Sequence, residues 1–127
     1  MITKNFSENE LSCSCPCKEN GMEPFTLNLL QELRDLYGKP MFLSSAYRCE
    51  THNSKVSKSG KSGPHTTGKA VDIRCFGTEA HEILRLALSI GFTGIGVSQK
   101  NKHKPARFIH IDTISSTKAN RPWTWSY

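Results

Sequence analysis

Two short segments of this chain alternate apolar residues with residues that can bind a metal, and this alternation restricts the fold more than any other feature. Residues 70–74 read AVDIR and residues 108–112 read FIHID. In a β-strand successive side chains point to opposite faces, so His110 and Asp112 share one face while the isoleucines beside them take the other. Two neighbouring strands of this kind present Asp72 and His110 to the same cleft. The pattern therefore predicts a sheet with one apolar face and one face that presents histidine and aspartate side chains.

A histidine on a loop completes this constellation. His65 lies seven positions before Asp72 and follows residues 57–64, which are rich in glycine and serine and so predict a loop. Two imidazoles and one carboxylate are common zinc ligands, and three protein ligands leave a fourth position for water, as in catalytic zinc sites. The same residue types also serve as partners in local hydrogen bonds and as turn caps. The spacing alone leaves both interpretations open.

Hydrophobic periodicity predicts two main helices, at residues 26–37 and at about residues 79–90, each followed directly by a glycine that ends it. Thr26 is expected to cap the first helix, and Phe25 to pack onto Leu30 as a hydrophobic staple. The expected apolar stripe of this helix consists of Leu29, Leu30, Leu33 and Leu36. Strands are expected at residues 41–44, 70–74, 95–98 and 107–112.

Helices and strands that follow one another without regular βαβ units predict an α+β fold. We expect a small antiparallel sheet with the two main helices packed on it and a zinc cleft on its exposed face. The chain of 127 residues contains no internal repeat and no linker. Its length suits one domain with a sizeable core, so residues 1–127 are expected to form a single domain.

The charge and composition of the chain limit the kinds of partner it is expected to bind. The net charge is +6 and the isoelectric point is near 9.2, which favours contact with polyanions such as anionic lipids or nucleic acid. The basic residues are dispersed and no nucleic-acid-binding module accompanies them, so no specific nucleic-acid partner is expected. There is no apolar run long enough for a transmembrane segment. The first ten residues lack the apolar core of a signal peptide, which predicts synthesis in the cytoplasm.

Five cysteines are present, and three of them form the run Cys13-Ser-Cys15-Pro-Cys17. An odd number of cysteines without a signal peptide favours reduced thiols. The run suggests a thiolate metal site, with Cys49 or Cys75 as the completing ligand. Structural zinc sites usually show paired C-x2-C motifs, so the role of this run is left open.

Longer motifs occur in a consistent order along the chain. They are SSAYRCETHN (residues 44–53), SGPHTTGKAVDI (62–73), GFTGIGV (91–97) and FIHID (108–112). Together they resemble the zinc D-Ala-D-Ala carboxypeptidases and endolysin peptidases, the M15 peptidases. Residues 5–15 and 121–123 are similar to the ends of the short members of this family that bacteriophages encode.

The resemblance implies roles for individual residues. His65, Asp72 and His110 would hold zinc. Arg48 would bind substrate and stabilise the oxyanion, as its charged, rigid fork allows, and Ser45 and Tyr47 would shape the substrate-binding wall. Many relatives carry an acid three residues before the last histidine ligand, where this chain has Arg107. Asp112 is therefore expected either to act as the general base or to orient a ligand imidazole.

The resemblance thus implies a monomeric zinc peptidase that cuts peptidoglycan stem peptides, as a D-Ala-D-Ala carboxypeptidase or as a DD- or LD-endopeptidase. Phage-mediated degradation of the bacterial cell wall, from the virion or at lysis, is the expected setting. Two alternatives remain open. The first, which Arg107 supports, is an inactive module of the same fold that binds the cell wall. The second is a nucleic-acid binder built around cysteine-bound zinc.

Overall fold

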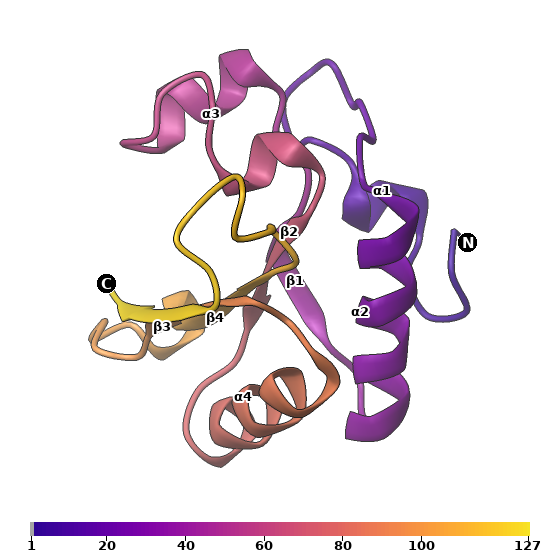
Figure 1. Ribbon diagram of the computed structural model, residues 1–127, viewed down its shortest axis with the longest axis vertical. Coiled ribbons are helices and arrows are strands. Elements are labelled where there is room, and N and C mark those ends of the chain that lie inside the picture. The colour runs from indigo at the N-terminus through magenta and orange to yellow at the C-terminus, as the bar shows by residue number, and fades with distance from the viewer. Residues whose placement is uncertain (1) are drawn as a thin grey trace.

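The computed structural model describes residues 2–127 and has an α+β fold (Figure 1). Its one five-stranded sheet has the order β1-β2-β4-β3-β5. The strands are β1 (Phe42–Ser45), β2 (Ala70–Arg74), β3 (Gly94–Ser98), β4 (Phe108–Asp112) and β5 (Trp123–Ser126). Neighbours from β1 to β3 are antiparallel, whereas β5 runs parallel to β3. The sheet is therefore mixed rather than wholly antiparallel. Residues 113–122 carry the chain from β4 past β3, so that β5 joins the other side of β3 in the parallel direction.

Strand β5 was not predicted from the sequence. It lies at the edge of the sheet, and three of its four residues are exposed. A strand of this kind lacks the alternation of buried and exposed side chains that marks a half-buried strand in a sequence. The other four strands lie within one or two residues of their predicted bounds.

The helices are α1 (Glu8–Leu11), α2 (Pro24–Tyr37), α3 (Glu50–Val56) and α4 (Thr78–Ile90), with two short 3₁₀ helices, η1 (Pro64–Thr67) and η2 (Lys104–Ala106). Gly38 and Gly91 follow α2 and α4 in the left-handed conformation, which glycine adopts without strain. No helix within residues 2–127 combines the length and apolar character needed to cross a membrane.

The start of α2 differs from the prediction. The helix begins two residues before Thr26, at Pro24, because proline is favoured at the first helical position. The Thr26 side chain lies inside the protein and forms a 2.6 Å hydrogen bond with that of Thr113. Phe25 is 69% exposed, so the predicted staple onto Leu30 is absent.

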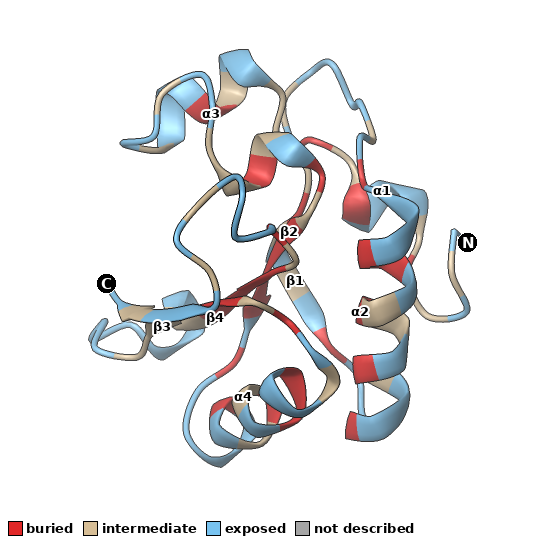
Figure 2. Ribbon diagram, viewed as in Figure 1, coloured by how far each residue is buried: buried red, intermediate tan, exposed pale blue. Residues whose placement is uncertain are grey.

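Helices α2 and α4 pack against each other and cover the apolar face of the sheet, where buried residues gather (Figure 2). From α2 the buried apolar side chains are those of Leu27, Leu30, Leu33 and Tyr37. They recur at the spacing of one helix face, whereas Leu36 of the predicted stripe is exposed. Complete burial of one leucine stabilises a fold by about 2 kcal/mol. This layer holds β2 and β4 in the register on which the polar face depends.

Candidate functional site

The structure brings His65, Asp72 and His110 together on the polar face of the sheet. Asp72 on β2 is the register partner of His110 on β4, and His65 projects from η1. Asp72 Oδ1 lies 3.0 Å from His110 Nδ1 and 3.2 Å from His65 Nε2. All three residues are buried. One ligand atom from each thus meets in a single small volume.

Each imidazole has one nitrogen engaged outside this volume. His65 Nδ1 donates a 2.8 Å hydrogen bond to the Ala46 carbonyl, and His110 Nε2 donates one of 2.8 Å to Asp112. His65 Nε2 and His110 Nδ1 are therefore left to face Asp72. Tetrahedral zinc with ligand bonds of 2.0–2.2 Å separates its donor atoms by about 3.3–3.6 Å. The donor chemistry fits a zinc ion, and the two distances from Asp72 Oδ1, 3.0 and 3.2 Å, lie slightly below this separation.

The charge of Asp72 follows from its surroundings. Burial by itself raises the pKa of a carboxyl group, but hydrogen bonds and charge from His110 and His65 outweigh burial and hold the pKa of Asp72 below its ordinary value. Asp72 is thus a carboxylate at neutral pH. A buried carboxylate between two imidazoles is an attractive site for a divalent cation.

Asp112 lies behind His110 and is completely buried. Its Oδ2 accepts hydrogen bonds from His110 Nε2 and from Arg121 Nη2, both at 2.8 Å, and its Oδ1 accepts one of 2.9 Å from Arg121 Nε. Burial alone would raise the pKa of Asp112, but His110 and Arg121 lower it. This geometry matches the carboxylate that fixes the orientation of a metal-binding histidine.

Arg121 belongs to a terminal motif of the sequence, and nothing local in that motif links it to Asp112. The Asp112 carboxylate fits beside β3 because residue 94 is a glycine. A Cβ at Gly94, the register partner of Asp112, would overlap the Asp112 carboxylate. Glycine at this point of β3 therefore allows the carboxylate to reach His110.

Arg48 is held at the same cleft by three neighbours. Its Nε donates a 3.0 Å hydrogen bond to Ser45 Oγ, its Nη1 donates one of 3.3 Å to Asn53 Oδ1, and its Nη2 lies 3.6 Å from Asp72 Oδ2. Asn53 is buried and also donates to the Gly60 carbonyl at 2.6 Å. The predicted glycine-rich loop is thereby tied to the guanidinium.

These residues line a cleft of about 480 Å³. Three aromatic residues, Phe108, Trp125 and Tyr127, form part of its wall, and the Trp125 ring lies 5.1 Å from that of His110. A Cβ at Gly96 would overlap Trp125, so this glycine of β3 makes room for the aromatic wall. Sequence reasoning missed Trp125 and Tyr127 because it missed strand β5.

Other predicted residues lie elsewhere. Tyr47 is not among the residues that line the cleft, although its neighbour Arg48 is. Its ring lies close to Gly21 and lines a separate hollow. Arg107 donates a 2.7 Å hydrogen bond to the Asn101 carbonyl. Among residues 2–127, Asp72 is the only carboxylate that lines the cleft.

Comparison with known proteins agrees with this geometry. The family model described as Peptidase M15 matches residues 4–112. The chain is also 32% identical, over 102 residues, to the peptidoglycan L,D-endopeptidase MepK of Escherichia coli strain K12 and to that of Shigella flexneri. Each match covers 76% of this chain and 53% of the relative, so the chain spans about half the length of the curated relatives it matches. The match to the family model covers most of the chain and shows that it belongs to the M15 peptidase family.

Proposed function

We propose that this chain is a zinc-dependent peptidase that hydrolyses stem peptides of peptidoglycan. The observation that carries the proposal is the cluster of His65, Asp72 and His110, in which each imidazole turns one nitrogen inward while the other is hydrogen-bonded. Membership of the M15 family and the similarity to peptidoglycan endopeptidases support the same activity. The basic charge of the chain suits an anionic envelope.

Zinc bound in this cluster would polarise the scissile carbonyl and activate water near neutral pH. His65, Asp72 and His110 are the proposed ligands. Arg48 is the proposed catalytic cation: its guanidinium lines the cleft beside Asp72, where it can bind a substrate carboxylate or the oxyanion that develops during hydrolysis. Ser45 holds Arg48 in this orientation through the hydrogen bond to Nε and contributes to the substrate-binding wall.

Asp112 is proposed as a positioning residue. It is completely buried, and both of its oxygens are occupied by His110 and Arg121, which favours the orienting role over proton transfer to or from substrate. Trp125 and Tyr127 replace Tyr47 as the proposed aromatic contacts for the peptide, because they line the cleft and Tyr47 does not.

The bond that is cut is part of the proposal. Because the curated relatives are named as L,D-endopeptidases, we expect cleavage within a cross-link, with D-Ala-D-Ala carboxypeptidase activity as the alternative. Phage-mediated cell-wall degradation remains the proposed setting, and it rests on the resemblance of residues 5–15 and 121–123 to phage-encoded members.

The test uses purified peptidoglycan and zinc-loaded protein. We expect new amino groups to be released, and mass spectrometry of the fragments identifies the bond. A chelator and the variant His65→Ala should each abolish release, whereas His81→Ala, an exposed histidine on α4, should leave it unchanged. Binding to peptidoglycan with no amine release would refute the peptidase and support the inactive cell-wall binding module.

A further inference from the structure

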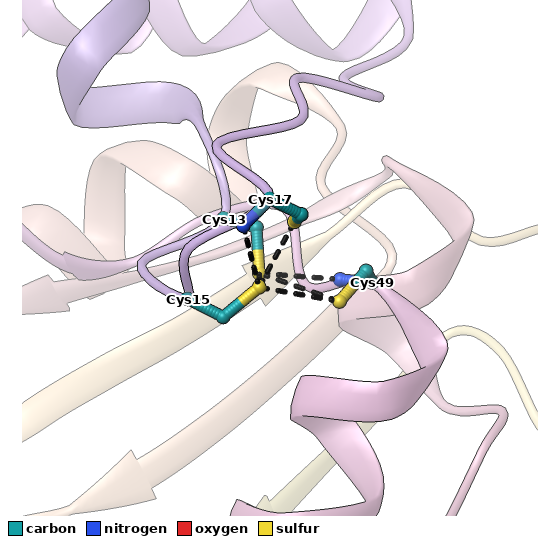
Figure 3. Close-up of side chains that lie close together, drawn as sticks. All are labelled: Cys13, Cys15, Cys17 and Cys49. Atoms are coloured by element: carbon teal, nitrogen blue, oxygen red, sulfur yellow. Dashed lines mark hydrogen bonds between the residues drawn. The ribbon is translucent and has the colours of Figure 1, made fainter.

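Four cysteines form a second cluster, outside the cleft (Figure 3). Cys13, Cys15 and Cys17 lie on the loop after α1, and Cys49 is the N-cap residue of α3. The Sγ atom of Cys15 lies 3.4 Å from that of Cys13, 2.9 Å from that of Cys17 and 3.5 Å from that of Cys49. The Cys13 and Cys49 sulfurs are 3.8 Å apart. Segments more than thirty residues apart in the sequence thus bring four thiols to one point.

The backbone around the cluster also faces the sulfurs. Each of the four Sγ atoms accepts one backbone N–H, at 3.4 to 3.5 Å. The Cys17 amide donates to Cys15 Sγ and the Glu19 amide to Cys17 Sγ. The Cys49 amide donates to Cys13 Sγ and the His52 amide to Cys49 Sγ. Hydrogen bonds of this kind stabilise the thiolate form of cysteine, and thiolate is the form that binds metals. Four sulfurs that each face an amide proton are therefore arranged for negative charge.

The sulfurs lie as close together as a tetrahedral site requires, with four of their separations between 2.9 and 3.8 Å. Zinc binds thiolate sulfur at about 2.3 Å, which places the four sulfurs of a tetrahedral site about 3.8 Å from one another. All four sulfurs lie within 4.8 Å of one another. None of the cysteines within residues 2–127 is in a disulfide. Disulfides would join the sulfurs in separate pairs, whereas here Cys15 has three sulfur neighbours.

We propose that Cys13, Cys15, Cys17 and Cys49 bind one zinc ion in a closed tetrathiolate site. Four protein ligands leave no open position, so the role is structural. The sequence shows no paired C-x2-C motif because three of the ligands have the spacing C-x-C-x-C and the fourth, Cys49, is a single cysteine from a distant segment. Cys75, the other candidate fourth ligand, is buried in the core and its thiol contacts the Ile73 carbonyl.

The position of the site indicates what it stabilises. The Ser14 hydroxyl on the cysteine loop forms a 3.2 Å hydrogen bond with His52 Nε2 of α3, and the Leu11 carbonyl just before the loop accepts one of 3.3 Å from the Tyr47 amide. Arg48 precedes Cys49 directly, and its amide donates to the His65 carbonyl at 3.2 Å. A zinc ion on Cys49 would therefore fix the backbone from which Arg48 reaches the cleft. The metal would also hold Cys17 and Cys49 together, and because zinc binds the folded site far more tightly than the unfolded chain, its binding free energy would add to the stability of the fold.

Metal analysis of protein purified under reducing conditions, loaded with zinc and desalted, tests the proposal. We expect two zinc ions per chain in the wild type and one in each of Cys15→Ser, Cys49→Ser and His65→Ala. Cys75→Ser is the matched control, because it removes a thiol outside the cluster, and it should retain two. The His65→Ala result separates this site from the proposed catalytic site.

Cobalt substitution in the wild type and in His65→Ala keeps the test decisive if the cysteine variants fail to fold. Four thiolates around Co²⁺ should produce an intense sulfur-to-metal charge-transfer band in both proteins. One zinc per wild-type chain that is lost in His65→Ala, or a cobalt complex without the thiolate band, would overturn the proposal. So would iron in place of zinc in the protein as purified, before it is loaded.

Discussion

Replacement of Asp112 by asparagine tests how the cleft is held together. The carboxylate accepts one hydrogen bond from His110 and two from Arg121 in a completely buried position. An asparagine amide has one oxygen and one NH₂ group, so whichever way it turns, an N–H donor of His110 or Arg121 meets another donor. Loss of one partner of a buried ion pair costs about 3 kcal/mol or more. For a chain of this length, 3 kcal/mol lowers the unfolding temperature by about 10 °C.

The same substitution should weaken zinc binding. If the asparagine turns its NH₂ group toward His110, that imidazole loses the acceptor that keeps its proton on Nε2 and its Nδ1 lone pair directed at the site; if the amide oxygen faces His110, the acceptor is neutral and weaker than the carboxylate. Loss of such a partner typically lowers metal affinity about 10- to 100-fold. Competition with a chromogenic chelator measures the affinity, and thermal unfolding of metal-free protein measures the stability.

The control for Asp112→Asn is Asp35→Asn, the same chemical change at an exposed position of α2, which should alter stability by less than about 0.5 kcal/mol. The orienting role would be refuted if Asp112→Asn kept its zinc affinity and its unfolding temperature while turnover alone collapsed. That result would assign proton transfer to Asp112.

Three further substitutions have expected outcomes. Arg48→Lys should retain zinc but lower kcat/KM about 100-fold or more, because one ammonium cannot keep the contacts of the guanidinium. Gly68→Ala should destabilise the fold by about 3 kcal/mol in urea unfolding, because Gly68 has φ +75° and its added Cβ would overlap the Gly21 carbonyl. Tyr37→Phe should flatten the alkaline loss of stability: burial, with a hydrogen bond to Glu79, raises the pKa of Tyr37 to about 12, so its stabilisation is present below about pH 10 and is lost as the pH rises toward 12.

Each of these has a clear contrary result. Unchanged turnover in Arg48→Lys would remove the guanidinium from the catalytic step, and loss of zinc in that variant would make its role structural. If Gly68→Ala unfolds at the same urea concentration as the wild type, the backbone around Gly21 must shift to accommodate the added Cβ. Parallel pH profiles for Tyr37→Phe and the wild type would show that the phenol does not couple to folding.

Local patterns in the sequence were sufficient for the centre of the candidate site. Alternation along residues 70–74 and 108–112 predicts that Asp72 and His110 share one face, and the register of β2 and β4 confirms the pairing. Helix α4 and its terminal glycine also follow the prediction closely. These features depend on periodicities of two and 3.6 residues, which any folded chain must satisfy locally.

Contacts that lie outside these local periodicities could not be predicted in this way. The parallel edge strand β5, the bidentate hold of Arg121 on Asp112 and the choice of Cys49 over Cys75 in the cysteine cluster all join residues with no shared local pattern. Tyr47 shows the same limit, since its side of the chain depends on the path of the backbone after β1.

The sequence by itself determined the α+β class, the three candidate metal ligands and the face of the sheet that carries two of them, because these follow from side-chain chemistry and local periodicity. Tertiary structure alone decided which nitrogen of each histidine points inward, that Asp112 lies behind His110 rather than in the cleft, and that four cysteines meet beside Arg48. The physical reason is that hydrogen-bond direction, burial and sulfur spacing depend on packing between segments far apart in the chain.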